Sequence, residues 1–192
     1  MPPSTVATGF LDRVFQLADL TFVFDVYEWV SNRLGRRTRP LTSHEQRVLY
    51  SIFGPSLPYA RIRIDERAYV GPRRYRFCYV SFHTINSWGP ISPPTLVHEA
   101  VHVWQYVHFG PLYIPRALAS QRSPMGYDYG GVPGLERADS LLDFNFEQMA
   151  SVIEDAYRLR ENYKPRFVTQ DMGNPSKCYV RFVEELKFAL FV

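Results

Sequence analysis

Several features that mark other protein classes are scarce in this chain of 192 residues. It has two cysteines, Cys78 and Cys178, so it lacks the disulfide framework of small secreted domains. We expect Cys78, which lies in a strand-like run, to be a buried free thiol. Charge of one sign is scarce too: the formal net charge is only +3, and the Lys and Arg residues are scattered. This balance disfavours a nucleic-acid partner.

The chain also lacks a long uninterrupted apolar run. Its most apolar stretch, residues 10–30, contains five charged residues, so we expect no transmembrane segment. The start of the chain has neither the basic region nor the apolar core of a secretory signal. We therefore expect a soluble, cytoplasmic protein, and export by a route that needs no signal peptide stays open.

What the sequence does contain is the motif His-Glu-x-x-His at residues 98–102. Residues four apart share one face of a helix, so His98 and His102 can bind a single metal ion. Zinc (Zn2+) suits such a site, because its catalytic centres combine three protein ligands with one open position. Glu99 lies one step round the helix, where it can take a proton from water. The pattern predicts a metal-dependent hydrolase.

The surroundings of the motif fit a buried helix. Apolar residues flank the two histidines, Ser92 or Thr95 can begin the helix, and Gly110 can end it. By length the chain forms one main domain, which we place at residues 40–192. Residues 1–39 form an N-terminal helical segment whose many apolar positions indicate packing on the domain or docking of a protein partner.

Before the motif, the pattern changes from helical to strand-like. Thr42 and Glu45 predict the start of a helix, with Gly54 at its end. Residues 60–65 and 75–85 alternate as strands do, so the fold class is α+β with a sheet directly before the motif helix. We expect residues 81–85 to form a rim that binds an extended peptide by strand addition. His83, within this rim, is expected at the surface or a strand edge rather than on the metal.

After the motif, residues 123–134 are rich in Gly, Pro and Tyr and predict a loop over the cleft. A long helix is predicted over residues 139–164, and a second amphipathic helix from residue 176 to the end. In the first of these, Leu142, Met149 and Ile153 belong to the predicted apolar row.

Two kinds of third ligand are available. His108 lies six residues after His102, which is the metzincin spacing, but Gln105 stands where that motif has its glycine. A continuing helix would carry His108 away from the ion. The stronger candidate is Glu147 on the later helix, because the small Ala150 on the next turn allows close approach of two helices. Glu154 and Asp155 fit solvated carboxylates better.

Together, His98-Glu-x-x-His102 and Glu147 resemble the gluzincin metallopeptidases. The stretch from His98 to Gln105 is similar to the His-Glu-x-x-His-x-x-Gln core of small bacterial proteins, several of which accompany toxin or contractile-injection systems. This resemblance, over about residues 40–160, implies a zincin-like domain. It implies His98, His102 and Glu147 as zinc ligands and Glu99 as the catalytic base.

One departure from the thermolysin-like pattern concerns the support of a ligand histidine. That pattern has an Asp four residues after the ligand Glu, where this chain has Ser151, so the supporting residue is unassigned, with Asp143 or Asp155 available. Tyr127 and Tyr129 are candidates for stabilising the oxyanion, although either can instead serve packing or loop structure.

Two functions from different classes follow. The first is a zinc-dependent peptidase that acts on a peptide or protein with Glu99 as general base. The second is a non-catalytic, zinc-stabilised structural or interaction module of a bacterial secretion or toxin system. Glu99 favours the peptidase, because a purely structural site has no need of a base there.

Overall fold

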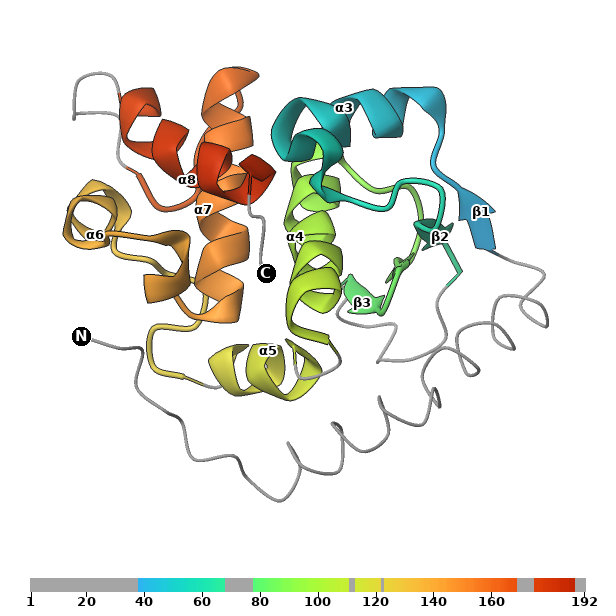
Figure 1. The fold of residues 1–192 in the computed structure, drawn as a ribbon, viewed down its shortest axis with the longest axis horizontal. Helices are drawn as coiled ribbons and strands as arrows, with labels where there is room; N and C mark the ends of the chain where they lie inside the picture. Colours follow the sequence, from blue (N-terminus) through green and yellow to red (C-terminus); the bar gives the residue numbers. More distant parts are fainter. Residues whose placement is uncertain (1–37, 68–77, 111–112, 122, 169–174, 189–192) are drawn as a thin grey trace.

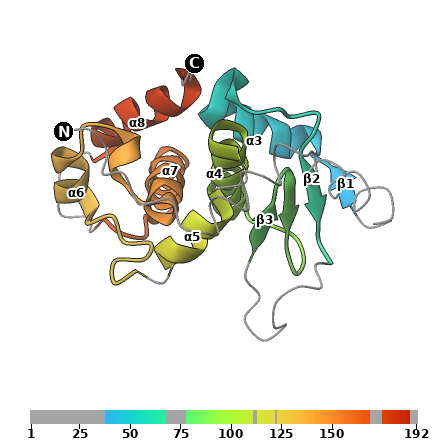
Figure 2. The same cartoon turned by 60° about the horizontal axis from the view of Figure 1, so that its bottom comes forward.

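The computed structural model describes residues 38–67, 78–110, 113–121, 123–168 and 175–188. The described part is α+β, as predicted: a small mixed sheet lies on one side of a group of helices (Figures 1 and 2). The helix predicted over residues 10–34, with its possible partner surface, lies outside the described residues.

The sheet has four short strands in the order β1-β2-β4-β3. The parallel pair is β2 with β4, and the two outer pairs are antiparallel. The strand predicted over residues 60–65 forms only at its end, and β1 straddles the predicted domain boundary at residue 39. The bounds are β1 Thr38–Pro40, β2 Arg63–Asp65, β3 Tyr79–Ser81 and β4 Thr84–Asn86.

The single strand predicted over residues 75–85 was wrong, because its described part is a hairpin. The chain reverses at Phe82 and His83, and Phe82 has a φ of 58°, the left-handed region that two-residue hairpin turns require. The turn contains none of the residues, Gly, Asn or Asp, that usually indicate a hairpin turn in a sequence. Instead, the hydroxyl of Tyr113 accepts from the Phe82 N–H at 3.2 Å and donates to the Val80 carbonyl at 2.8 Å.

The rim predicted at residues 81–85 also needs correction. Its second half belongs to β4, which is paired on both sides, so the edge of the described sheet near this hairpin is β3. His83 is buried rather than at the surface, and its ring lies edge-on to that of Tyr106, 5.0 Å away.

Helix α3 (Ser43–Phe53) begins after Thr42 and ends before Gly54, as predicted. Thr42 accepts from the Glu45 N–H, and the Glu45 carboxylate accepts from the Thr42 N–H, which completes a capping box. Gly54 follows the helix with a φ of 52° and begins the 3₁₀ turn η1 (Gly54–Ser56). Leu49 and Phe53 on its inner face are fully buried.

The motif helix is α4 (Pro93–Phe109), and it runs beside α7 (Phe146–Arg160) through the middle of the molecule (Figures 1 and 2). Ser92 caps α4, as predicted, and Gly110 ends it with a φ of 63°, which a side chain would oppose. Helices α4 and α7 make the most extensive contact between any two elements of the described chain. Their shared face is where the candidate ligands meet.

Helix α7 begins later than predicted. Asn145 caps it by accepting from two backbone N–H groups, and the preceding segment forms the 3₁₀ turn η3 (Leu141–Asp143) instead. The carboxylate of Asp143 accepts from the N–H groups of Asp139 and Ser140, so it closes this turn rather than facing the metal ligands. Leu142 is 46 % exposed and does not belong to the inner row predicted for it.

The remaining helices surround this pair. Helix α5 (Tyr113–Gln121) follows α4, and α6 (Gly131–Arg137) lies on the far side of α7 from α4, whereas α8 (Ser176–Phe188) packs on α7 and reaches across to α3 (Figures 1 and 2). Residues 131–134, predicted as loop, thus begin a helix. No helix of the described chain is long and apolar enough to cross a membrane.

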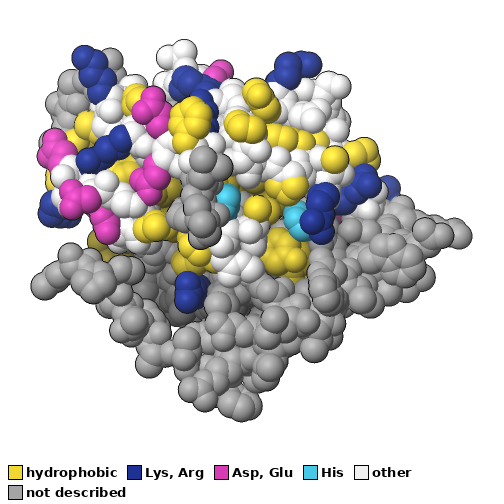
Figure 3. All heavy atoms as spheres, in the orientation of Figure 1, with side chains coloured by type: hydrophobic (Ala, Val, Ile, Leu, Met, Phe, Trp, Pro, Cys, Tyr) yellow, Lys and Arg dark blue, Asp and Glu magenta, His cyan; other side chains and the backbone are white. Residues whose placement is uncertain are grey.

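A single apolar core joins α3, α4, α7 and α8. Trp104 of α4 lies at its centre, fully buried, and its indole N–H donates to the Leu186 carbonyl of α8 at 3.2 Å. On the face shown in Figure 3, hydrophobic side chains form a band across the middle, and the acidic side chains gather on the α6 side. Cys78 and Cys178 are both free, and both are half-buried.

Candidate metal centre

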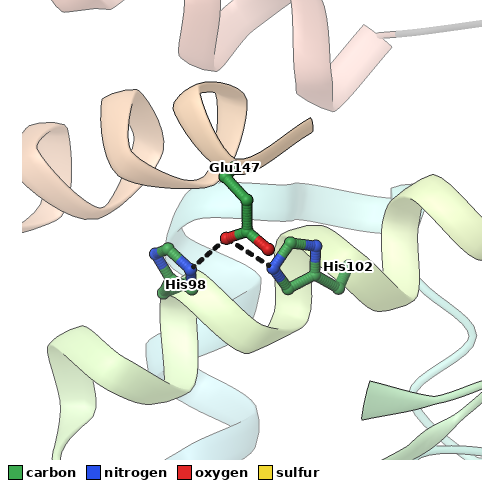
Figure 4. A group of neighbouring side chains, drawn as sticks. All are labelled: His98, His102 and Glu147. Atoms are coloured by element: carbon green, nitrogen blue, oxygen red, sulfur yellow. Dashed lines mark ion pairs between the residues drawn. The ribbon is translucent and has the colours of Figure 1, made fainter. Parts of the chain in front are cut away.

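Three predicted ligands come together between α4 and α7. His98 and His102 of α4 point toward Glu147 of α7, and all three side chains are buried (Figure 4). The Oε2 atom of Glu147 lies 3.4 Å from His98 Nε2 and 3.5 Å from His102 Nε2. The three ligand atoms lie within 4.8 Å of one another, so the group could hold a metal ion.

The geometry of these ion pairs is compatible with a cation between the three side chains. Glu147 Oε2 is a buried oxygen that lacks a hydrogen-bond partner among the described residues, which is costly unless something else compensates it. Zinc bonds of about 2.0–2.2 Å in tetrahedral geometry place neighbouring ligand atoms about 3.4 Å apart. The two measured separations match that spacing, whereas hydrogen bonds to nitrogen are usually shorter.

The outward nitrogen of His102 is fixed by Gln105. The Gln105 amide donates from Nε2 to the Phe146 carbonyl at 2.9 Å, which leaves its Oε1 as the acceptor. That oxygen lies 2.8 Å from His102 Nδ1. Because an amide oxygen can only accept, Nδ1 carries a proton, and in the neutral ring the lone pair is on Nε2, the atom that faces Glu147.

The corresponding partner of His98 is Glu154, whose Oε2 lies 3.1 Å from His98 Nδ1. The same carboxylate accepts from Arg158 Nε at 2.8 Å and from Arg166 at 3.1 Å. Glu154 is therefore not the solvated carboxylate that the sequence indicated; it is buried and orients a ligand. Such partners fix the ring and raise the basicity of a ligating histidine.

The other oxygen of Glu147 is also held. Gln121, at the end of α5, donates to Glu147 Oε1 at 2.8 Å. With Oε1 occupied, Oε2 is the atom available as a single-oxygen ligand. Each of the three candidate ligands thus has one polar atom that contacts a neighbouring side chain and one that points toward the other two ligands.

The carboxylates around His98 and His102 stabilise positive charge at these two residues. Burial is the largest single cause at His98 and His102 and would lower their pKa values, but the neighbouring carboxylates together outweigh it and raise them: Glu147 and Glu99 at both residues, and Glu154 at His98. The pKa of Glu147 is lowered, against burial, by the two histidines. A buried carboxylate beside the Nε2 atoms of two histidines is a donor set that borderline metals such as zinc accept.

Glu99, the predicted base, is buried next to the candidate ligands. Burial is the main cause that raises its pKa, and the charges of Glu147 and Glu154 add to it, while His98 and His102 oppose it. A carboxylate with a raised pKa is a better proton acceptor than one in water.

The structure separates the two predicted tyrosines. The ring centre of Tyr127 lies 5.9 Å from that of His98, so this residue borders the group. Tyr129 is buried elsewhere: its hydroxyl donates to Asp155 Oδ2 at 2.7 Å and also contacts the hydroxyl of Tyr179. The hydroxyl of Tyr129 is therefore engaged by Asp155 and Tyr179, which disfavours the oxyanion role predicted for it.

Other candidates lie apart from the group. The ring of His108 packs on Trp104, 4.3 Å between centres, so α4 continues past residue 105 and carries His108 away, as expected. Asp155 is buried, not solvated, and accepts from Tyr129 and from the N–H groups of Arg166 and Phe167 rather than supporting a ligand.

Sequence reasoning missed the roles of Gln105, Gln121 and Glu154. Spacing carried two of the signals: Gln105 lies one turn after His102, and Glu154 lies two turns after Glu147 on the same face. Gln121 comes from another helix and had no local signal. Comparison of the chain with protein-family models, curated proteins and solved structures found no match.

Proposed function

We propose that this protein is a zinc-dependent peptidase of the gluzincin type. The observation that carries the proposal is the buried, unsatisfied Oε2 of Glu147, at nearly equal distances from two Nε2 atoms whose rings are fixed from behind. The order of a small mixed sheet, a His-Glu-x-x-His helix and a glutamate-bearing helix supports a zincin-like domain.

In this proposal His98, His102 and Glu147 hold the ion. When bound, zinc supplies a Lewis acid that makes water a better nucleophile and polarises a peptide carbonyl. Glu99 accepts the proton of the attacking water and returns it to the leaving amine. Tyr127, beside His98, is the tyrosine placed to donate toward charge on the carbonyl oxygen.

The test compares the wild type with Glu99→Gln. Glu99 is not a ligand, so the variant should keep its zinc and its melting temperature. Peptide cleavage should fall by at least about 100-fold, the lower end of what general-base catalysis contributes. Metal analysis and turnover of a broad peptide library give both readouts.

The outcomes separate the two functions. Zinc kept with cleavage lost supports the peptidase. A wild type that binds zinc and cleaves nothing favours the non-catalytic, zinc-stabilised module. Equal cleavage by both proteins would assign the activity to another site.

A further inference from the structure

Arg166 lies at the border of the candidate metal centre and has no role in holding the ion. Its NH1 group donates to Glu154 Oε2, the same oxygen that His98 Nδ1 contacts, and both distances are 3.1 Å. Its guanidinium carbon lies 5.8 Å from the ring centre of Tyr127, which in turn borders His98. Arg166, Tyr127 and His98 are thus consecutive neighbours along one wall of the centre.

The charge of Arg166 is not needed to balance Glu154. Arg158, one turn along α7, already binds Glu154 Oε1 through two nitrogens, each at 2.8 Å. His98 supplies a further N–H to Oε2. Arg166 adds a second positive charge to a single carboxylate, and within the described part of the chain it bonds Glu154 through one nitrogen, where a guanidinium offers five N–H donors.

Arg166 also differs from Arg158 in its exposure and support. Its side chain is 43 % exposed, against 22 % for Arg158, so its remaining donors can reach solvent or a ligand. Its backbone is fixed, because its N–H donates to Asp155 Oδ1 at 2.7 Å. Its guanidinium also lies 5.2 Å from the ring centre of Phe167. An exposed guanidinium on a fixed backbone between aromatic rings is preorganised to bind a carboxylate in a forked geometry.

We propose that Arg166 is a specificity residue, and that its guanidinium, held beside Tyr127 and His98, binds a carboxylate of the substrate. The preferred ligand is then an acidic peptide. The carboxylate comes either from a free C-terminus or from an Asp or Glu side chain, since both present the same chemistry. The inference rests on the proposed peptidase for the reaction, but the binding preference can be measured without turnover.

The experiment uses the zinc-loaded, full-length Glu99→Gln protein, so that bound peptides stay intact. The probes are N-acetylated hexapeptides of Ala, Leu and Phe in three forms: a free C-terminal carboxylate, the same sequence amidated, and the amidated sequence with one Gln or one Glu at each position in turn. Affinities are measured by calorimetry. We expect carboxylate-bearing peptides to bind about tenfold more tightly than their neutral partners, which corresponds to one charge-assisted hydrogen-bonded contact.

Four further variants are made in the same background. Arg166→Gln should abolish the preference for the carboxylate and leave zinc content unchanged, and Arg166→Lys should retain part of it. Arg158→Gln removes the other guanidinium on Glu154 and should keep the preference. Arg47→Gln, on the exposed side of α3, controls for the loss of one positive charge.

Each result decides something. A gain from the free C-terminus alone identifies a C-terminal carboxylate, and a gain from Glu alone identifies a side chain. Equal binding of charged and neutral peptides would overturn the inference, as would an Arg158→Gln variant that loses the preference as completely as Arg166→Gln. A carboxylate preference in a wild type that cleaves no peptide would retain Arg166 as a binding residue while rejecting the peptidase.

Discussion

At the scale of single residues, each candidate ligand has one atom near the group and a second atom in contact with another side chain. These second atoms are His98 Nδ1, His102 Nδ1 and Glu147 Oε1. His102→Ala and Glu147→Ala each remove a donor of a three-ligand set. Zinc affinity should fall by more than about 100-fold, beyond the loss typical of an outer partner. Chelator competition and metal analysis measure it, with His108→Ala as the control, since His108 packs on Trp104 instead. Full zinc retention in either variant would remove that residue from the ligand set.

The outer partners have a smaller, graded effect. Gln105→Leu keeps the size of the side chain but removes the acceptor of His102 Nδ1 and the donor to Phe146. We expect zinc affinity to fall by about 10- to 100-fold, because the ring loses its preferred tautomer and orientation. Gln46→Leu, at an exposed position of α3, is the matched control. An unchanged affinity in Gln105→Leu would show that the helix alone orients His102.

Residue-scale prediction from sequence succeeded where one helix carries the geometry. His98 and His102 follow from their spacing alone, and Glu147 was reached through the small Ala150 on its next turn. Glu154 was misjudged because an acidic residue on a helix is normally solvated. Its burial depends on Arg158, His98 and a guanidinium from beyond the helix, and these contacts exist only after folding.

At the scale of elements, α3 can be used to test how much a local capping residue contributes to the stability of a helix. Thr42→Ala removes the acceptor for the Glu45 N–H and should cost about 1 kcal/mol of unfolding free energy, measured by chemical denaturation. Ser43→Ala, at the first helical position beside this cap, is the control. A variant as stable as the wild type would show that tertiary packing holds α3 without its cap.

The Glu45 carboxylate in the same cap should make the stability of the protein depend on pH. Hydrogen bonding to Arg39 is the largest cause that lowers the pKa of Glu45, from 4.5 to about 2. Because the folded-state pKa is depressed, this contribution is fully present above pH 4.5 and is lost as the pH falls toward 2. Glu45→Gln should lose part of the acid-induced destabilisation in that window. Identical pH profiles of stability for the two proteins would contradict it.

Elements were predictable where turn residues mark them. Thr42, Ser92 and Gly110 are residues that commonly cap helices. Helix α3 begins after Thr42, and α4 begins after Ser92 and ends before Gly110. The hairpin at Phe82 lacked such a signal, because a left-handed aromatic residue is held there by the distant Tyr113. The start of α7 was placed too early, since the capping box of Asn145 lay inside a segment with continuous helical periodicity.

At the scale of the whole molecule, the candidate ligands come from the two halves of the fold. His98 and His102 lie on α4, which contacts the sheet, and Glu147 lies on α7, which contacts α8 and α5. A bound ion would therefore bridge helices that are far apart in sequence. It would also compensate a buried oxygen of Glu147 that lacks a hydrogen-bond partner among the described residues. Metal binding should for this reason be coupled to the stability of the whole domain.

Removing zinc should lower the melting temperature. With free zinc at about 100 to 1,000 times its dissociation constant, the ion contributes about 3–4 kcal/mol, provided that it binds only the folded chain. For a protein of this size, that corresponds to a shift of about 6–16 °C. Calorimetry with and without a chelator measures the shift, and added zinc should reverse it. Glu147→Ala should melt at one temperature under both conditions, because it lacks the ligand from α7 that lets the ion join the two helices. A wild type whose melting temperature ignores the chelator, while metal analysis shows the zinc gone, would mean that the ion does not bind the folded chain in preference to the unfolded one.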